Sequence, residues 1–380
     1  MRKFLKDTEK HFKSGGKYER FYSLFEMVDT FLYTPSSETS KAPFIRDFID
    51  IKRVMMFVII AMLPTLIFGI YNVGYQINNS YSFINNFKSG IIVVGPIIAV
   101  SYAVGGFWEM LFAIVRKHEI NEGFLVTGML IPLIMPPSIP LWMVAVATTF
   151  GIVIGKEIFG GTGYNIFNPA LLSRAFIFFA YPAAISGEKV WTADGLSQAT
   201  PLLEISSIQI NTNISDYILS YSWNEMFLGL IPGSIGETST LAILIGAIFL
   251  IITGVGSWRI MLGTLFGMVI TANITNLFGS MTNTSNSMLM ITPLNHFVMG
   301  GFAFGMVFMA TDPVSASQTN AGRWIYGLLI GFMCIIIRAI NPAYPEGMML
   351  GILFANAFAP LIDYYVIEMH AKKRYKRFGT

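Results

Sequence analysis

Long apolar runs follow one another along the chain from residue 54 onward. A helix that crosses the hydrocarbon core of a bilayer needs roughly 20 predominantly apolar residues. We therefore expect transmembrane helices at 54–72, 90–115, 123–136, 140–156, 165–182, 237–256, 260–279, 293–311, 323–340 and 347–367. The pattern predicts an all-α integral membrane protein, a bundle of about ten transmembrane helices.

Two of these runs are interrupted by helix-breaking residues. The third stops at Pro136-Pro137, and the fifth opens with Gly160-Gly161-Thr162-Gly163 and contains Asn168-Pro169. Asp312-Pro313 stands near the end of the eighth run as a second polar-proline pair. Related breaks in two halves suggest inverted repeats whose broken helices face a central pathway. Prolines tolerated as simple kinks are the alternative explanation.

Composition agrees with the apolar pattern. The chain has 380 residues, of which 54% are hydrophobic and 12% charged, whereas soluble domains carry about 25% charged residues. Five segments are expected: a cytoplasmic N-terminal segment (1–50), a first transmembrane half (51–182), an external loop (183–236), a second transmembrane half (237–369) and a basic cytoplasmic tail (370–380).

The distribution of Lys and Arg predicts the orientation. Basic residues flank the expected spans at Lys52-Arg53, Arg116-Lys117, Arg259, Arg323 and 372–377. With ten spans and both termini in the cytoplasm, all these groups fall on the side that the positive-inside rule requires. The loop 183–236 is then external. Flanking of membrane helices explains the net charge of +3, so no nucleic-acid partner is expected.

The thiol and imidazole groups offer little metal chemistry. Cys334 is the only cysteine and lies in an apolar run, which predicts a buried hydrophobe rather than a disulfide or an iron–sulfur ligand set. The four histidines are scattered along the chain. No metal site held by this chain alone is expected.

Acidic residues inside the expected spans are the first functional candidates, since a charge in the membrane is costly and usually functional. Glu109 is the most deeply placed, after Gly105-Gly106. Glu122, Asp312 and Asp363 lie near span ends, where access to water explains them equally well. The glycine pair permits close helix contact or leaves room for a flat ring.

The loop 183–236 contains a second candidate, the motif Asp194-x-x-Ser197-x-Ala199-Thr200. Such a short string is most often only a turn. An exposed threonine hydroxyl with small neighbours is nevertheless able to form a phosphoester with the terminal phosphate of FMN. A nearby carboxylate would help to dock a Mg²⁺-bound flavin donor.

Long strings at many places resemble the B subunits of the sodium-translocating NADH:quinone oxidoreductases, over essentially the whole chain. The strings are Lys3–Leu5, Gly15–Lys17, Tyr33–Pro35, Gly105–Glu109, Gly160–Gly163, Asn168–Leu171, Phe179–Pro182, Ala310–Ser317 and Asn341–Met349. The related D subunits of Rnf complexes usually lack the N-terminal extension of about 50 residues, so the B subunits are favoured.

This resemblance implies two flavins. In the family the final threonine of the motif carries FMN through a phosphoester, which points to Thr200, with Asp194, Ser197 and Ala199 completing the flavin-transfer motif. Gln198 departs from the pattern, because the family usually has glycine there. A riboflavin is held noncovalently in the membrane part.

The resemblance also implies a place in electron transport. Electrons pass through the flavins towards ubiquinone or menaquinone and are coupled to sodium export. The implied quinone region comprises Gly105, Gly106, Glu109, Glu122 and Gly123, and the implied ion pathway comprises Glu109, Asp312 and Asp363.

The implied setting is the bacterial inner membrane, in a six-subunit NADH:ubiquinone reductase. Subunits A, C, D, E and F are the expected partners, a flavin transferase is needed for maturation, and the isolated chain is expected to be inactive. A D-type Rnf subunit and a non-redox secondary transporter are the alternatives. Whether Na⁺ or H⁺ moves is open.

Overall fold

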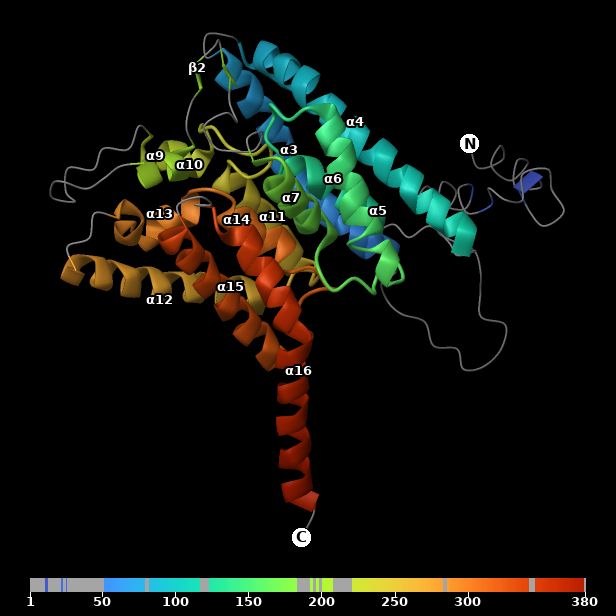
Figure 1. Cartoon of the computed structure of the whole chain (residues 1–380), viewed down its shortest axis with the longest axis vertical. Coiled ribbons are helices and arrows are strands. Elements are labelled where there is room, and N and C mark those ends of the chain that lie inside the picture. Colours follow the sequence, from blue (N-terminus) through green and yellow to red (C-terminus); the bar gives the residue numbers. More distant parts are fainter. Residues whose placement is uncertain are drawn as a thin grey trace.

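Helices make up nearly all of the structure (Figure 1). The computed structural model describes residues 11–12, 22, 25, 51–78, 82–116, 123–182, 192–193, 196–197, 200–207, 221–282, 286–341 and 346–378. Every expected span corresponds to helical segments in this part of the chain. The expected all-α membrane fold is therefore confirmed, with one small β-hairpin in addition.

Within these residues, six helices are long and apolar enough to cross a membrane. They are α3 (Ile51–Ile77), α4 (Phe83–Arg116), α6 (Leu141–Val153, with the turns that follow it), α12 (Trp258–Thr282), α15 (Asn320–Ile340) and α16 (Met348–Phe378). Three shorter apolar helices accompany them: α5 (Gly123–Leu133), α7 (Pro169–Ala180) and α11 (Thr240–Ile252).

The eighth expected span, 293–311, is not one helix. It is divided into α13 (Pro293–Val298), α14 (Phe302–Phe304) and the π-helix η5 (Gly305–Met309). Gly300 adopts a φ of 65°, a left-handed conformation that glycine accepts without steric cost. The chain turns there, and the apolar pattern alone does not reveal the turn.

The remaining elements are short and lie in connections. They are η2 (Glu157–Phe159), β1 (Thr192–Ala193), β2 (Leu196–Ser197), α9 (Pro201–Ser207), α10 (Trp223–Leu228) and η4 (Ser287–Met290). β1 and β2 pair antiparallel, with Thr192 opposite Ser197.

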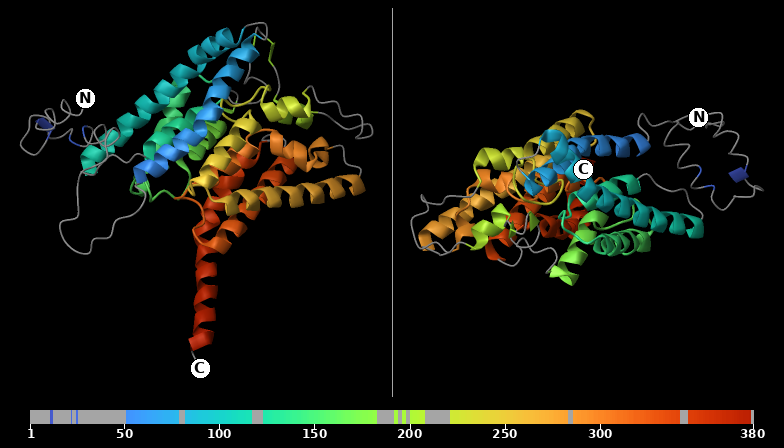
Figure 2. Two further views of the ribbon diagram at one scale, coloured as in Figure 1. Left: turned by 180° about the vertical axis from the view of Figure 1, so that it is seen from behind. Right: turned by 90° about the horizontal axis from the view of Figure 1, so that it is seen from above.

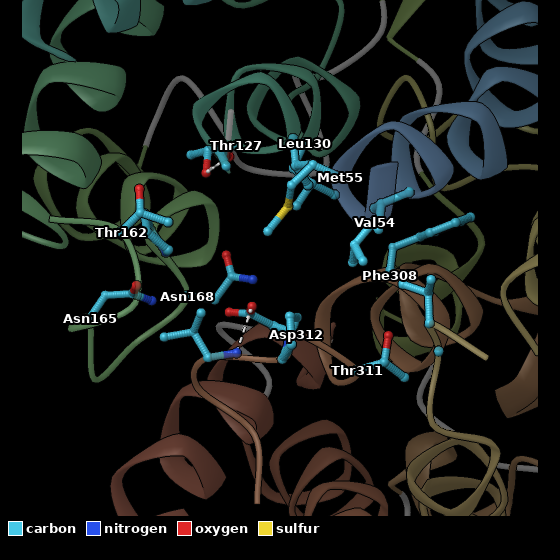
Figure 3. Close-up of a pocket in the computed structure, with 18 of the residues that line it drawn as sticks. Val54, Met55, Thr127, Leu130, Thr162, Asn165, Asn168, Phe308, Thr311 and Asp312 are labelled. Atoms are coloured by element: carbon cyan, nitrogen blue, oxygen red, sulfur yellow. Dashed lines mark hydrogen bonds between the residues drawn. The ribbon is translucent and has the colours of Figure 1, made fainter. Parts of the chain in front are cut away.

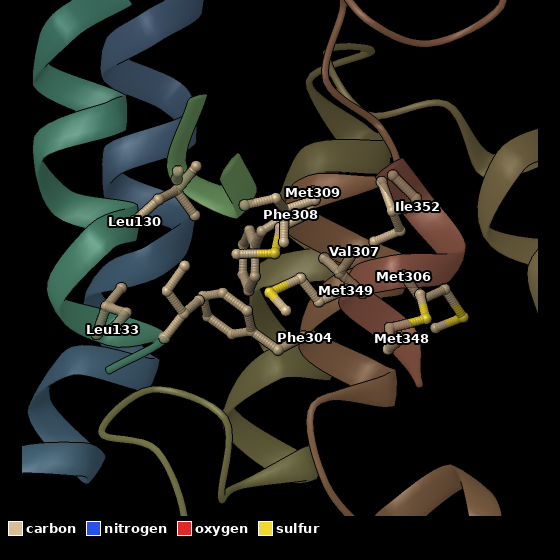
Figure 4. Close-up of a cluster of buried hydrophobic side chains, with 14 of the residues drawn as sticks. Leu130, Leu133, Phe304, Met306, Val307, Phe308, Met309, Met348, Met349 and Ile352 are labelled. Carbon is tan, nitrogen blue, oxygen red and sulfur yellow. The ribbon is translucent and has the colours of Figure 1, made fainter. Parts of the chain in front are cut away.

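The two halves of the sequence occupy two sides of the bundle (Figures 1 and 2). α3 to α7 form one side, and α11 to α16 form the other. Their apolar faces meet in one buried cluster, to which Leu130 and Leu133 contribute from α5, Phe304 and Phe308 from the broken span, and Met349 from α16 (Figure 4).

Glycines bring α12 and α15 into close contact. Gly263 and Gly267 on α12 face Gly327 and Gly331 on α15, so each helix carries a small-x-x-x-small pair. A Cβ on Gly331 would lie 2.5 Å from the backbone nitrogen of Met268. Backbone therefore packs directly on backbone along this pair.

The last helix runs out of the bundle. The C-terminal part of α16 stands apart from the other elements and ends in the basic tail (Figure 1). Asp363 fixes α16 to the start of α15 before it leaves. Its carboxylate accepts hydrogen bonds from Ser317 Oγ at 2.6 Å, from Gln318 N at 2.7 Å, and from the nitrogen and hydroxyl of Thr319.

The glycine contact gives a test of the fold. We expect Gly331→Ala to lower the free energy of unfolding by about 1–3 kcal/mol, the usual cost of overpacking a tight contact. Gly95→Ala on α4 is the matched control, because its Cβ would meet only Ile91 Cγ2 at 3.9 Å. Thermal unfolding in detergent measures both, and equal melting temperatures would contradict the assignment of this contact.

Candidate functional site

A cavity of about 70 Å³ lies where the two halves meet, and it is partly open to the outside. One wall comes from α3, α5 and the connection before α7, and the other from the end of α11 and the segment after η5 (Figure 3). Most of the lining is apolar. The polar side chains in it are Thr127, Lys156, Thr162, Asn165, Asn168, Thr311 and Asp312.

Asn168 reaches the cavity because it caps α7. Its Oδ1 accepts hydrogen bonds from Ala170 N at 3.0 Å and from Leu171 N at 3.3 Å, and Pro169 occupies the first helical position. Both features are typical of a helix start. The expectation that Asn168-Pro169 interrupts the fifth span is therefore corrected: the helix begins at this pair.

Asp312 lies across the cavity from the first half. Its Oδ1 accepts from Val314 N at 3.2 Å and its Oδ2 from Ser315 Oγ at 2.7 Å. Asp312 follows η5, whereas Asn168 precedes α7, so the two polar-proline pairs are not equivalent positions of a repeat. They do line one cavity, together with Gly123.

Glu109 belongs to a buried ion-pair cluster beside this cavity. Its carboxylate pairs with the ammonium of Lys156, and both side chains are 3% exposed. Lys156 Nζ also donates to Thr162 Oγ1 at 3.0 Å and lies 3.9 Å from Glu157 Oε1. Arg116 completes the cluster with a 3.2 Å contact to Glu157 Oε2.

Lys156, Glu157 and Arg116 were not identified from the sequence as site residues. The signal was present, because Lys156 ends an otherwise apolar expected span and a charge there is as costly as a carboxylate. Because only acidic residues were considered, Lys156, the partner of Glu109, was left out.

Gly105 serves close packing in the same region. A Cβ there would collide with the ring of Phe124 and lie 2.8 Å from Ile152 Cδ1. The Phe124 ring lies 3.7 Å from a Cβ built on Gly106. Phe124 also packs edge-on against Tyr102. Glu122 lies outside the described residues, and the quinone assignment of these positions stays a prediction.

Thr200 is half-buried and stands immediately before α9. Its carbonyl accepts from Glu204 N at 2.9 Å. Ser197 lies in β2, and Asp194, Gln198 and Ala199 lie outside the described residues. The motif therefore extends from the hairpin to the start of a helix.

α9 is held against the broken eighth span. Leu202 and Ile205 join a buried apolar cluster with Val298 and Met299, and Ser287 Oγ donates to the Ile205 carbonyl. The position of Thr200 is thereby tied to the break at Gly300.

Arg338 supports that break from α15 and is fully buried. Its guanidinium donates to the carbonyls of His296 and Met299 at 2.9 Å each and of Glu346 at 2.8 Å. Carbonyls at the end of a half-helix attract a cation, and here a side chain supplies it. Each of these oxygens therefore accepts a hydrogen bond from the guanidinium.

A second ion-pair cluster lies next to it. Arg174 on α7 donates to Glu346 Oε2 and to Ser234 Oγ at 2.8 Å each, and lies 3.8 Å from Glu237 Oε2. Sequence reasoning did not identify Arg174, Arg338, Glu237 and Glu346 as site residues. Arg174 and Glu346 are 172 residues apart in the chain.

We expect Arg338→Met to destabilise the protein, since buried carbonyls left without donors cost about 1–3 kcal/mol each. Arg323→Met removes the same charge from the same helix at a partly exposed position and serves as the control. Melting temperatures in detergent test this. A loss no larger for Arg338→Met than for the control would contradict the role of the guanidinium.

Comparison with known proteins gives one consistent result. The NQR2, RnfD, RnfE family matches residues 38–372. Proteins named as the B subunits of Na(+)-translocating NADH-quinone reductases are similar throughout. Those from Stutzerimonas stutzeri (strain A1501), Ectopseudomonas mendocina (strain ymp) and Yersinia pestis are 51%, 50% and 50% identical, each over 99% of this chain and 99% of the relative. The resemblance drawn from the sequence is confirmed.

Proposed function

The chain belongs to the NQR2, RnfD, RnfE family, and from this premise we propose that it is the B-type membrane subunit of a Na⁺-translocating NADH:quinone reductase. In this proposal it relays electrons through a covalent FMN and a noncovalent riboflavin to ubiquinone or menaquinone. Sodium export across the bacterial inner membrane is coupled to the relay. The proposal rests on the B-type relatives, which are 50% and 51% identical to this chain over 99% of its length.

The matched lengths favour this complex over an Rnf complex. The similarity to the B-type relatives covers 99% of both chains, including the N-terminal extension that Rnf D subunits usually lack. Subunits A, C, D, E and F are the proposed partners, and NADH is oxidised outside this chain. Both termini would be cytoplasmic, in agreement with the basic end of α16.

Thr200 is the proposed attachment point of FMN, and its surroundings fit that group. The residue is partly exposed, and no described side chain makes a hydrogen bond to its hydroxyl. Pro201 fixes the backbone beside it, and the packing of Leu202 and Ile205 holds α9 on the bundle. A flavin esterified here would stay at one place on the external side.

We expect Thr200→Ala to abolish covalent flavin, because alanine has no hydroxyl to esterify. Thr200→Ser keeps a hydroxyl and should retain a reduced flavin band. In-gel ultraviolet fluorescence of the denatured chain, coexpressed with the flavin transferase, distinguishes them. A band of undiminished intensity in Thr200→Ala would place the attachment at another residue.

The cavity between the halves is the proposed site of riboflavin. Small-molecule sites are typically concave and mostly apolar, and contain a few polar groups that fix orientation. The cavity has apolar walls from Met55, Leu130 and Phe308, with Asn165 and Asn168 among its polar groups. A flat ring would be held between these walls once they move apart, because the cavity as it stands measures about 70 Å³. The bound flavin would supply the electron-transfer chemistry.

Met55→Trp tests this placement by filling the cavity. We expect the variant to lose noncovalent flavin and to keep the covalent FMN of Thr200. Ile60→Trp on the same helix is the control, since Ile60 is 41% exposed and does not line the cavity. Acid extraction followed by flavin quantification measures the noncovalent fraction. Normal riboflavin content in Met55→Trp would exclude this cavity.

The quinone would bind near Gly105, Gly106 and Gly123, and the cation would pass through the region of Glu109 and Asp312. Asp312 lines the cavity, and Glu109 is linked to it through Lys156. The four hydrogen bonds to Asp363 connect α15 and α16, so any part it takes in ion transport would include movement of these helices.

A further inference from the structure

Lys156 contacts both the buried carboxylate of Glu109 and the cavity. Coupling between charge in the cavity and cation uptake would need a link between these two features. The ammonium of Lys156 pairs with the buried carboxylate of Glu109. The same side chain lines the cavity, and so does Thr162, which accepts its hydrogen bond at 3.0 Å. One positively charged group is thus in contact with the carboxylate and stands at the cavity wall.

Because Glu109 and Lys156 are both buried, it is unfavourable for either charge to lose its partner. Glu109 and Lys156 are each 3% exposed, and a carboxylate left alone in such surroundings carries a desolvation penalty of several kcal/mol. The ionised form of Glu109 is therefore stable only with a cation beside it. In the structure that cation is Lys156, and any mobile cation must displace it.

We propose that Lys156 is a tethered cation that competes with the mobile cation for Glu109. This proposal rests on the proposed function of the cavity. When the cavity occupant gains negative charge, the ammonium turns from Glu109 towards the cavity and compensates that charge. Glu109 then binds a cation of the same charge from the cytoplasm. Reoxidation draws Lys156 back, and the mobile cation is released.

The surroundings of Lys156 are suited to this exchange. Glu157 lies 3.9 Å from Nζ and keeps a second carboxylate beside it. Arg116 holds Glu157 in place through a 3.2 Å contact and a hydrogen bond to its carbonyl. The Arg116 side chain is 33% exposed and sits at the end of α4, which gives the cluster an edge towards water. Asp312 is the acidic side chain that lines the cavity itself.

The exchange predicts a specific change in sodium dependence. Removal of the tethered competitor leaves Glu109 permanently available, and apparent affinity rises by the inverse of the fraction of sites that were available before. We expect Lys156→Gln to lower the half-saturating Na⁺ concentration for quinone reduction about tenfold, if Lys156 holds Glu109 about nine-tenths of the time. Lys156→Arg keeps the positive charge and should remain near wild type.

The experiment uses the complete purified complex, with Lys88→Gln as control because Lys88 is an exposed residue of α4. A tenfold lower half-saturating Na⁺ concentration in Lys156→Gln alone supports the competition. An unchanged value with both flavins present overturns it. If the wild-type complex contained no noncovalent flavin, that result would instead contradict the proposed function.

If the Lys156→Gln complex is too unstable for the activity assay, its melting temperature provides a second test. Mobile Na⁺ would then replace the missing ammonium at Glu109, and a ligand that binds only the folded state stabilises it. We expect Na⁺, and not choline at equal ionic strength, to raise the melting temperature of the variant towards that of wild type. Equal melting temperatures in both salts would contradict the tethered-cation role.

Discussion

Backbone groups inside a membrane must find partners within the protein, because lipid offers none, and this requirement organises the structure. Two expected spans, the fifth and the eighth, are interrupted at three places inside the bundle, and a side chain meets each interruption. Asn168 caps α7, Asp312 binds the backbone that follows η5, and Arg338 receives the carbonyls beside Gly300. The apolar cluster between the halves then excludes water around them.

The polar side chains that meet these interruptions also place polar groups inside the protein. Asn168 and Asp312 stand at the cavity because α7 begins there and η5 ends there. Glu109 pairs with Lys156, and Arg174 pairs with Glu346, since a buried carboxylate left without a partner would be strongly destabilising. Breaking such a pair requires another charge to arrive, and this makes a paired cluster suitable for coupling cation movement to electron transfer.

Much of the architecture follows from the sequence. Each of the ten expected apolar runs contains helix in the described part of the chain, and prolines marked the end of α5 and the start of α7. The apolar pattern of the run 293–311 does not distinguish one continuous helix from a broken one, so the turn at Gly300 was missed. Glu109 was selected by its charge inside a span, and Lys156 was overlooked because only acidic residues were considered. Arg174 and Arg338 were overlooked because Glu346 and His296, which they contact, lie 172 and 42 residues away. Thr200 was predicted as a site residue from a motif, and the packing of α9 on the bundle fixes its position.

We propose that electrons cross this protein by way of flavins, one of them bound covalently to Thr200. Mass spectrometry of the peptide containing Thr200, from the complex purified out of its native membrane, tests this most directly. The account predicts one FMN joined through a phosphoester to that hydroxyl. An unmodified peptide, in a complex assembled with its flavin transferase present, would contradict it.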